Sequence, residues 1–487
     1  MLDTGYSSSR WVSNSEHRES SIKSRNVDTL LSVAAVVVYV ILLAFVALRA
    51  RASREFEDFS VAKRELPLAL IFGSIAADYI GPGFSIGFVG RGFKSGFLFL
   101  AVGLAYAVQN IFVGLLVAPK LRQLKGCYTL GDAIGQKYDR KCQILAGVIS
   151  VALCASFSAV MISAGSVVLN DIFGLPRWLS VTVVAVVTAS YTTFGGLRAS
   201  VITDAFHFVL FALLLPVTLL YALLFHFEGG AASFFQQASA ATAEGFSSTP
   251  TIQIVGFVAA FLLGETLIPP YANLALASRT TKVSRNGFIL AGVFSTLWFT
   301  VMIAIGIVAR TVVAGDTKQD YVLLTFVGSI MPHVGYALLL VALVSVVLSS
   351  LDSLLNAGAV VFTQDIIRRF SHLPDALALK AGRYSTIIIA AVAAAAAAFV
   401  PSVIEGLLVC YSIWAPAILP ALIFGLWLKA PRPLAAILSM GTGSSVAVIF
   451  QFALPTVVNV PAIIPALGSS LLAYVLGHWL GKTKSGV

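Results

Sequence analysis

Six polar side chains interrupt an apolar stretch that runs from about Gly335 to Gln364, long enough to cross a membrane. They are Ser345, Ser349, Ser350, Asp352, Ser353 and Asn356. On a helix, all but Ser350 fall along one face, which must contact protein or water because lipid offers no hydrogen-bond partner. Oxygen ligands without Cys or His suit a small hard cation, so the segment predicts one wall of a cation site. A Ser-rich packing seam is the alternative, but Asp352 favours the site because a buried carboxylate needs a partner.

Two other apolar stretches contain residues that break helices. One holds Asp78–Gly83, and the other holds Gly264–Tyr271. Gly and Pro free backbone groups from the helix, which at membrane depth is tolerated only where the backbone lines a cavity or is buried in protein. The breaks lie five spans apart, so the second block of five would run inverted, and matching broken helices then predict the binding site of a secondary transporter. Two ordinary proline kinks are the alternative.

The composition is that of a polytopic, all-α membrane protein. Of 487 residues, 58% are hydrophobic and 11% charged, and the mean hydropathy is +0.92. The four cysteines have no metal or redox spacing, and no nucleophile–base pair appears, so we expect neither an enzyme nor a cofactor beyond a coupling ion. Thirteen spans are predicted, at roughly 29–48, 66–90, 96–118, 144–168, 178–194, 199–226, 252–277, 288–309, 335–364, 384–400, 404–428, 433–453 and 460–480.

These spans predict a domain organisation with a polar tail at 1–28 and a peripheral helix at 29–48. The first repeat would cover 66–226 and the second 252–428, followed by peripheral helices at 433–480 and a short tail at 481–487. Residues 228–250, which lack Lys and Arg, are predicted to form an external loop.

Positive charge predicts the orientation. Of the 32 Lys and Arg residues, 23 fall in loops that follow odd-numbered spans, 5 in loops that follow even-numbered spans and 4 in the N-terminal tail. Because cytoplasmic loops carry the excess of Lys and Arg, the odd loops and the C-terminus are predicted to be cytoplasmic and the N-terminus to be outside. The net charge of +10 therefore indicates membrane topology rather than nucleic-acid binding. We expect a multi-pass protein of the inner (plasma) membrane.

The polar motifs resemble those of the sodium/solute symporter family, which includes bacterial proline, sugar, pantothenate and sialic acid transporters. Ser349–Asn356 followed by Phe362–Ile366 is similar to the family pattern Ser-Ser-x-x-Ser-x-x-Asn…Phe-Thr-x-Asp-Ile/Leu. Gly195–Asp204 and Ala76–Gly81 carry two further similarities, and the resemblance covers about residues 29–480. It implies a core of five-plus-five inverted repeats and a coupling sodium ion.

The resemblance also implies two cation sites. The first would use Ala76, Tyr79, Val346, Ser349 and Ser350, with backbone carbonyls from the first three residues and hydroxyls from the last two. Some members hold a second sodium ion at positions that match Asp204, Asp352 and Ser353. Asp352 replaces a hydroxyl of the family pattern, so two carboxylates would share one region and need either a cation or a shared proton. From the residues alone, Asp204 is equally well a helix-start carboxylate.

We expect the substrate between the two broken helices, against Asp78, Gly81, Pro82, Gly83, Phe84, Glu265 and Tyr271. Asp78 matches an aspartate of the proline-transporter branch, while Glu265 either faces the cavity or lies solvated at its mouth. The acid–amide pair of the sugar-binding members is replaced by Pro82 and Gly83, which argues against a sugar. Positive ends of half-helices favour a substrate carboxylate, so an amino acid, organic acid or vitamin-like solute is expected.

The leading functional hypothesis is therefore sodium-driven uptake of a small organic solute by alternating access. Proton-coupled transport through Asp204 and Asp352 is an alternative within the same fold. A membrane sensor is an alternative from another class, although only residues 481–487 follow the last predicted span. The expected partners are the solute, sodium and the lipid bilayer, without nucleic acid. The sequence indicates neither the solute nor the oligomeric state.

Overall fold

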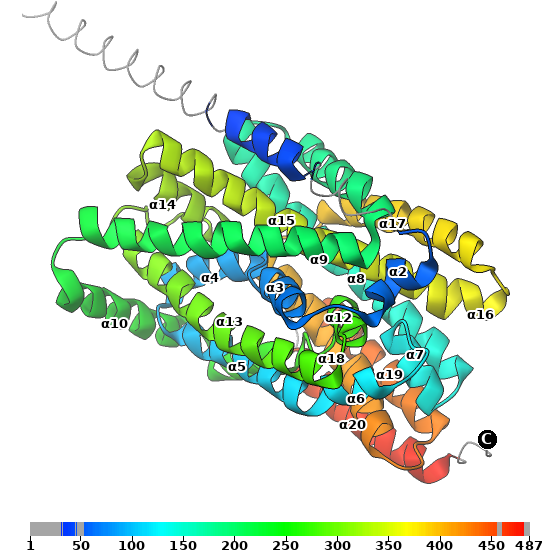
Figure 1. Cartoon of the computed structure of the whole chain (residues 1–487). Coiled ribbons are helices and arrows are strands. Elements are labelled where there is room, and N and C mark those ends of the chain that lie inside the picture. Colours follow the sequence, from blue (N-terminus) through cyan, green and yellow to red (C-terminus); the bar gives the residue numbers. More distant parts are fainter. Residues whose placement is uncertain (1–30, 32, 44, 46–52, 455–459, 482–487) are drawn as a thin grey trace, which may run out of the picture.

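The computed structural model describes residues 31, 33–43, 45, 53–454 and 460–481, and in this part of the chain the regular elements are helices (Figure 1). The predicted tails, apart from Gly481, and parts of the predicted first span lie outside the described residues. The helices are Val33–Leu43, α2 (Phe56–Val61), α3 (Leu68–Tyr79), α4 (Pro82–Ser95), α5 (Leu98–Phe112), α6 (Ala118–Gln123), α7 (Leu130–Lys137), α8 (Arg140–Phe173), α9 (Arg177–Phe225), α10 (Gly230–Ser248), α11 (Thr251–Leu263), α12 (Pro269–Ala277), α13 (Thr281–Ala309), α14 (Val322–Ile330), α15 (His333–Val361), α16 (Arg368–Phe370), α17 (Asp375–Ala397), α18 (Val403–Trp427), α19 (Pro433–Val448) and α20 (Ile463–Leu480).

Nine helices among the described residues are long and apolar enough to cross a membrane. The number rises to as many as eleven if two bent pairs, α3 with α4 and α10 with α11, each count as one span. The longest, α9, has 49 residues and would be roughly 74 Å long if straight, more than twice the hydrocarbon thickness. It is divided at Gly196, whose φ of 63° and ψ of −169° are non-helical. The two arms of α9 coincide with the predicted spans 178–194 and 199–226. The count of thirteen spans and the domain boundaries stay predictions.

Both predicted helix breaks are confirmed. The helices α3 and α4 meet at Ile80 and Gly81 with a bend of 46°, and Pro82 opens α4. Similarly, α11 ends at Leu263 and α12 begins at Pro269. Proline suits the first turn of a helix because its fixed φ is helical and its missing N–H needs no partner there, so each sequence stops one helix and starts the next.

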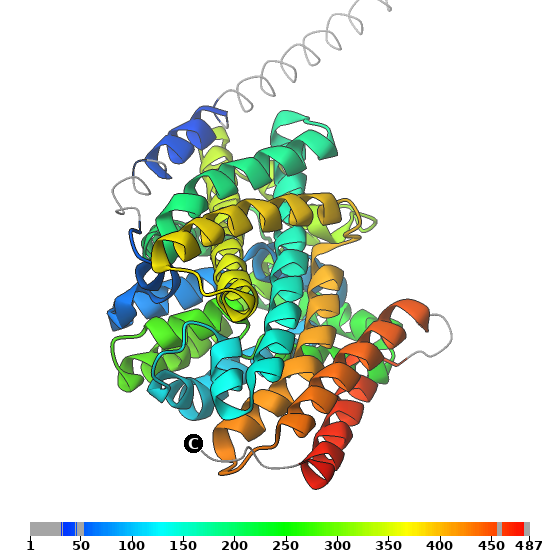
Figure 2. The ribbon, with the colours of Figure 1, turned by 90° about the vertical axis from the view of Figure 1, so that its right-hand side faces the viewer.

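The helix α15 packs against both α8 and α9 (Figures 1 and 2). Almost every side chain from Ala337 to Val361 is buried, including the six polar ones singled out above. A helix that is buried all round needs protein partners for its polar groups, so the surrounding helices must supply them.

The segment 228–250, which the sequence predicts to be an external loop, is not an irregular loop, because it forms the helix α10 over Gly230–Ser248. Its location outside the membrane stays a prediction. Six Ala residues, two Gln and Glu244 favour a helix, while Gly229, with φ 89°, lies at its start. The helix is anchored by its side chains: the Thr242 hydroxyl accepts from the Phe97 N–H at 2.9 Å, and Glu244 pairs with Arg310 at 2.8 Å. Small, polar composition therefore misled the prediction where tertiary contacts stabilise a helix.

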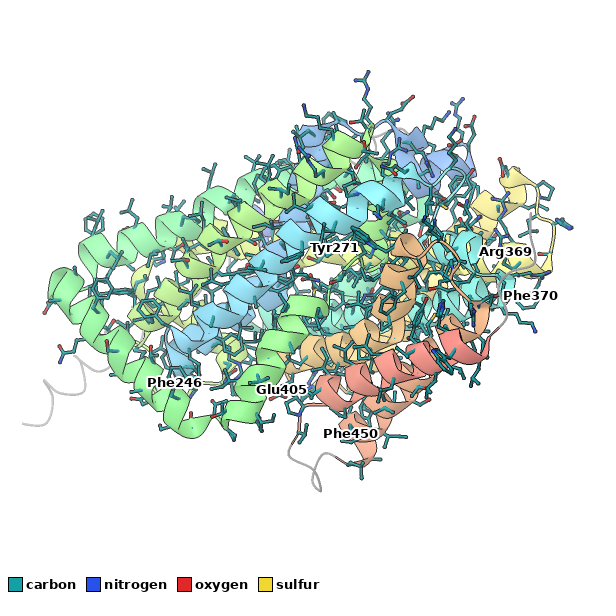
Figure 3. All side chains as sticks on the ribbon, turned by 90° about the horizontal axis from the view of Figure 1, so that it is seen from below. Phe246, Tyr271, Arg369, Phe370, Glu405 and Phe450 are labelled. Atoms are coloured by element: carbon teal, nitrogen blue, oxygen red, sulfur yellow. The ribbon has the colours of Figure 1, made fainter. Side chains whose placement is uncertain are left out.

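Loops of the same parity contact one another. Among the odd loops, Arg64 donates to the Cys127 carbonyl at 2.6 Å, and Arg383 donates to the Ser53 carbonyl at 3.0 Å. Among the even loops, Lys94 donates to the Gly315 carbonyl at 2.6 Å. Figure 3 shows Arg369 and Phe370 of an odd loop at one end of the molecule and Phe246 of an even loop toward the other, with Tyr271 between. This arrangement agrees with the alternation of positive charge.

Candidate functional site

The first broken helix touches α15 at Ser350. A Cβ atom placed on Gly81 would lie 2.7 Å from the Ser350 hydroxyl and 2.8 Å from the Asp78 carbonyl oxygen, so only a glycine allows this approach. Near the same break, the carbonyl of Ala76 accepts from the Ile80 N–H at 3.0 Å. Ser350 is buried, and no hydrogen-bond partner satisfies its hydroxyl within the described chain. One of the two predicted sodium-ligating hydroxyls therefore lies beside the break.

The other predicted hydroxyl, Ser349, faces a second cluster. It donates to Asp204 at 2.7 Å, and Ser74 of α3 donates to the same carboxylate at 2.5 Å. Ser353, one turn further along α15, lies 3.4 Å from Asp204. Asp204 thus ties the second arm of α9 to α3 and to α15, and it is completely buried.

Asp352 lies in the same region and is bound by the second arm of α9. Ser200 donates to it at 2.8 Å and Thr203 at 3.2 Å, and the Ser200 and Ser353 hydroxyls lie 3.2 Å apart. The structure thus brings Asp204, Asp352 and Ser353 together, as predicted. Within the described chain, neither carboxylate forms an ion pair with Lys, Arg or His.

Three residues of this cluster were missed by the sequence analysis: Ser74, Ser200 and Thr203. A signal was present for two of them, because Ser200, Thr203 and Asp204 are spaced three and four residues apart and share one helical face. Ser74 carried no comparable signal, since its role depends on how α3 packs against α9.

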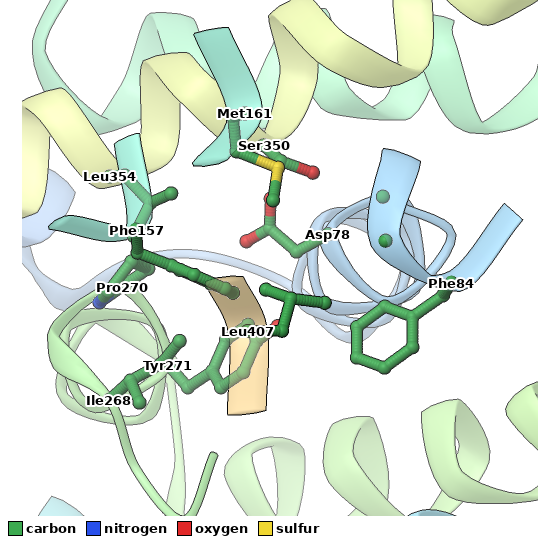
Figure 4. A pocket seen from close by; sticks show the side chains of 12 residues that line it. Asp78, Phe84, Phe157, Met161, Ile268, Pro270, Tyr271, Ser350, Leu354 and Leu407 are labelled. Carbon is green, nitrogen blue, oxygen red and sulfur yellow. The ribbon is translucent and has the colours of Figure 1, made fainter. Parts of the chain in front are cut away.

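Both broken helices line a small cavity (Figure 4). It contains ≈ 310 Å³ of space between atoms, but the centre of a water molecule could occupy only ≈ 10 Å³ of it, which is about enough for one water. A larger solute needs the walls to separate. The lining residues are Asp78, Gly81, Gly83, Phe84, Phe157, Met161, Ile268, Pro270, Tyr271, Ser350, Leu354 and Leu407.

Five of the seven predicted substrate residues lie on this cavity, while Pro82 and Glu265 do not. Glu265 instead accepts hydrogen bonds from three tyrosine hydroxyls, those of Tyr106, Tyr411 and Tyr271, the last at 3.3 Å. It is not among the residues that line the cavity, and because its exposure is only 2% it is not solvated at the mouth either. Its carboxylate fastens the second break to α5 and α18, and it holds Tyr271 at the cavity wall.

The apolar cavity residues on α8, α15 and α18 were missed. Phe157, Met161, Leu354 and Leu407 look like ordinary residues of apolar helices in the sequence. Only the packing of these helices around the two breaks gives them a place at the cavity (Figure 4).

The approach to the cavity along α4 and the start of α18 is tightly packed. A Cβ atom on Gly83 would come within 2.2 Å of Leu407, and one on Gly87 within 2.5 Å of Ile404, so α4 and the start of α18 lie in direct contact. A separate, much larger cavity lies among the even loops and is lined partly by Arg177, Asp320 and Glu405; the centre of a water molecule could occupy ≈ 430 Å³ of it.

Two broken helices, a buried polar helix between them and a cavity at their meeting point define the protein as a membrane transporter of the secondary type. The family model of the sodium:solute symporter family matches residues 59–443, and the chain belongs to this family. It is 24% identical over 426 residues to the uncharacterized symporter YidK of Escherichia coli, covering 80% of this chain and 72% of that protein. It is 23% identical to the sodium/pantothenate symporter of Haemophilus influenzae, covering 88% of this chain and 91% of that protein.

The fold is also shared with a solved structure. A Na⁺-coupled sialic acid symporter, in a substrate-bound outward-open state, superposes with a TM-score of 0.79 over 94% of this chain and 99% of that one. The identity of 14% restricts this likeness to the fold.

Proposed function

We propose that the chain is a sodium-coupled symporter that imports a small organic solute across the inner (plasma) membrane by alternating access. The observation that carries the proposal is the Ser350 hydroxyl, which faces the α3–α4 break and has no hydrogen-bond partner in the described part of the chain. Carbonyls of Ala76, Tyr79 and Val346 with the Ser349 and Ser350 hydroxyls would supply the hard oxygen ligands that sodium prefers. One charge moving down 100 mV contributes about 2.3 kcal/mol, enough for nearly fiftyfold solute accumulation.

Removing one ligand at a time tests the sodium site. Uptake into proteoliposomes by Ser349→Ala and Ser350→Ala should need a higher sodium concentration for half-maximal rate, because each loses one direct oxygen ligand. Ser444→Ala is the matched control, since that hydroxyl bonds to the Met440 carbonyl in α19, away from the site. Unchanged sodium dependence in both site variants would refute the assignment. A lack of transport for every solute tested would favour a sensor.

Asp204 and Asp352 support a second coupling ion. Two buried carboxylates whose described partners are hydroxyls repel one another strongly unless a cation or a proton lies between them. We propose that a second sodium ion binds between the two carboxylates. The alternative is that the two carboxylates share a proton. Uptake measured over a grid of pH and sodium concentration separates the two.

With a second sodium ion, Asp352→Ser should keep uptake cooperative in sodium, because it restores the hydroxyl of the family pattern. With a proton, the same change should flatten the pH dependence between about 5 and 8. If neither Asp352→Ser nor Asp204→Asn alters either dependence, the pair is structural.

We also propose that the even loops face outward and the C-terminus the cytoplasm. Ser247 in α10 and Ser371 after α16 are both exposed, so a cysteine at either position is open to an impermeant thiol reagent. Ser247→Cys should be labelled from outside and Ser371→Cys only after the membrane is opened. The wild-type chain is the control, because its four cysteines are buried. The opposite labelling would reverse the orientation.

A further inference from the structure

The Asp78 carboxylate is the most unusual group of the cavity. It is only 7% exposed, and no hydrogen bond satisfies either of its oxygens within the described chain. Figure 4 shows it among the lining side chains, close to Ser350 and Met161. An ionised carboxylate buried without hydrogen-bond donors is costly, so the charged form of Asp78 favours a ligand that brings a positively charged or donor group to this position.

The helix ends that face the same cavity offer little to an anion. A helix start usually presents free N–H groups, but α4 begins with Pro82, and the N–H groups of Phe84 and Ser85 both bond to the Gly81 carbonyl. The first two residues of α12, Pro269 and Pro270, have no N–H. These helix ends therefore lack most of the N–H donors that would bind the substrate carboxylate expected from the sequence.

The remaining walls suit a cation with an apolar body. Phe84, Phe157 and Tyr271 contribute aromatic rings to the lining, and aromatic faces attract ammonium groups most strongly where water is excluded. The other walls are largely aliphatic, including Met161 and Leu407. Asp78 would repel a solute that carries only negative charge.

We propose that the transported solute carries an ammonium group that binds to Asp78, on a small apolar body held by the aromatic walls. This inference rests on the proposed symport function and narrows its substrate class from small organic solutes in general to organic cations and zwitterions. It disfavours solutes whose only charged group is a carboxylate. Sodium is the other possible source of positive charge at Asp78, so the experiment must separate an inorganic from an organic cation.

The experiment measures the thermal midpoint of the purified full-length protein while matched probes are titrated. Each probe set contains an amino acid, its amino alcohol and its N-acetyl derivative, which carry an ammonium with a carboxylate, an ammonium alone and a carboxylate alone. Sets built on proline, leucine and phenylalanine vary the apolar body. Every titration is done in sodium and in potassium, with wild type, Asp78→Asn and the control Asp132→Asn, which removes a buried carboxylate outside the cavity.

In at least one set, the amino acid and the amino alcohol should both stabilise the wild type, and the N-acetyl derivative should not. Asp78→Asn should raise the half-saturating concentration by about tenfold or more, since it removes a charge-assisted hydrogen bond. Asp132→Asn should bind as the wild type does. Stabilisation by the N-acetyl derivatives, equal binding by Asp78→Asn, or no ammonium-dependent effect in any set would overturn the proposal.

Titrations in sodium and in potassium distinguish a failure of this inference from a failure of the proposed sodium-coupled function. If Asp78→Asn changes only the titration with sodium alone, the carboxylate binds sodium and the ammonium assignment is wrong, while sodium coupling stands. If the ammonium probes stabilise equally in sodium and in potassium, the assignment of Asp78 stands and sodium coupling fails.

Discussion

Gly81→Ala perturbs the contact on which the proposed sodium site depends. The φ of Gly81 is −43°, which any residue can adopt, so the expected cost comes from packing and not from backbone strain. The new Cβ atom would lie 2.7 Å from the Ser350 hydroxyl and 2.8 Å from the Asp78 carbonyl oxygen. A hydroxyl can rotate away but a carbonyl in a helix end cannot, so the break must shift relative to α15.

Overpacking by one methyl group costs about 1–3 kcal/mol. If the methyl group destabilises the conformation in which Ser350 lies at the break, ion binding weakens by between about fivefold and 150-fold, since 1.4 kcal/mol corresponds to a tenfold change in the dissociation constant. Gly83→Ala should cost less, although its Cβ atom would lie only 2.2 Å from Leu407, because the contact is with the flexible end of that side chain.

The assay is sodium-dependent uptake in proteoliposomes, with the thermal midpoint measured in parallel. Gly441→Ala is the matched control, because nothing lies within 4 Å of its new Cβ atom, and a helical glycine replaced by alanine in open space should gain slight stability. We expect the half-saturating sodium concentration to increase in the order Gly441→Ala, Gly83→Ala, Gly81→Ala. Equal sodium dependence for Gly81→Ala and Gly441→Ala would show that the break does not approach α15 closely.

Three further predictions concern other parts of the fold and use the thermal midpoint. Burial raises the pKa of the Asp132 carboxyl group, so the folded protein keeps this proton to higher pH than the unfolded chain does. The stability of the folded protein should therefore fall as pH rises from the pKa of the unfolded chain to that of the folded protein, and Asp132→Asn should flatten that fall. Glu265→Gln should lower stability by about 2–3 kcal/mol, because a carboxamide cannot accept from three hydroxyls as a carboxylate does, and an unchanged midpoint would contradict the cluster. Lys63 has a left-handed φ of 55° and pairs with Glu55. Both Lys63→Gly and Lys63→Ala lose this ion pair, but only glycine relieves the backbone strain of the left-handed conformation, so Lys63→Gly should be the more stable variant. The reverse order would exclude backbone strain at this position.

The general architecture followed from the sequence because its causes are local or compositional. Apolar segments as long as a bilayer is thick predicted the membrane class, and Gly81–Pro82 and Pro269–Pro270 predicted both helix breaks. Proline ends a helix through its own ring, whatever surrounds it. Asp352 predicted that α15 is buried, since a carboxylate in a spanning helix must face protein or water.

The site itself was decided by tertiary structure. Ser349 and Ser350 are adjacent in sequence, yet one binds Asp204 and the other faces the cavity, because neighbouring residues on a helix point about 100° apart and meet different helices. From the sequence, Glu265 was equally well placed facing the cavity or solvated at its mouth. In the structure it lies in neither position, because it accepts hydrogen bonds from three tyrosines on three different helices. The apolar wall residues carry no sequence signal, since a cavity is formed by the space between helices and a single helix does not contain it.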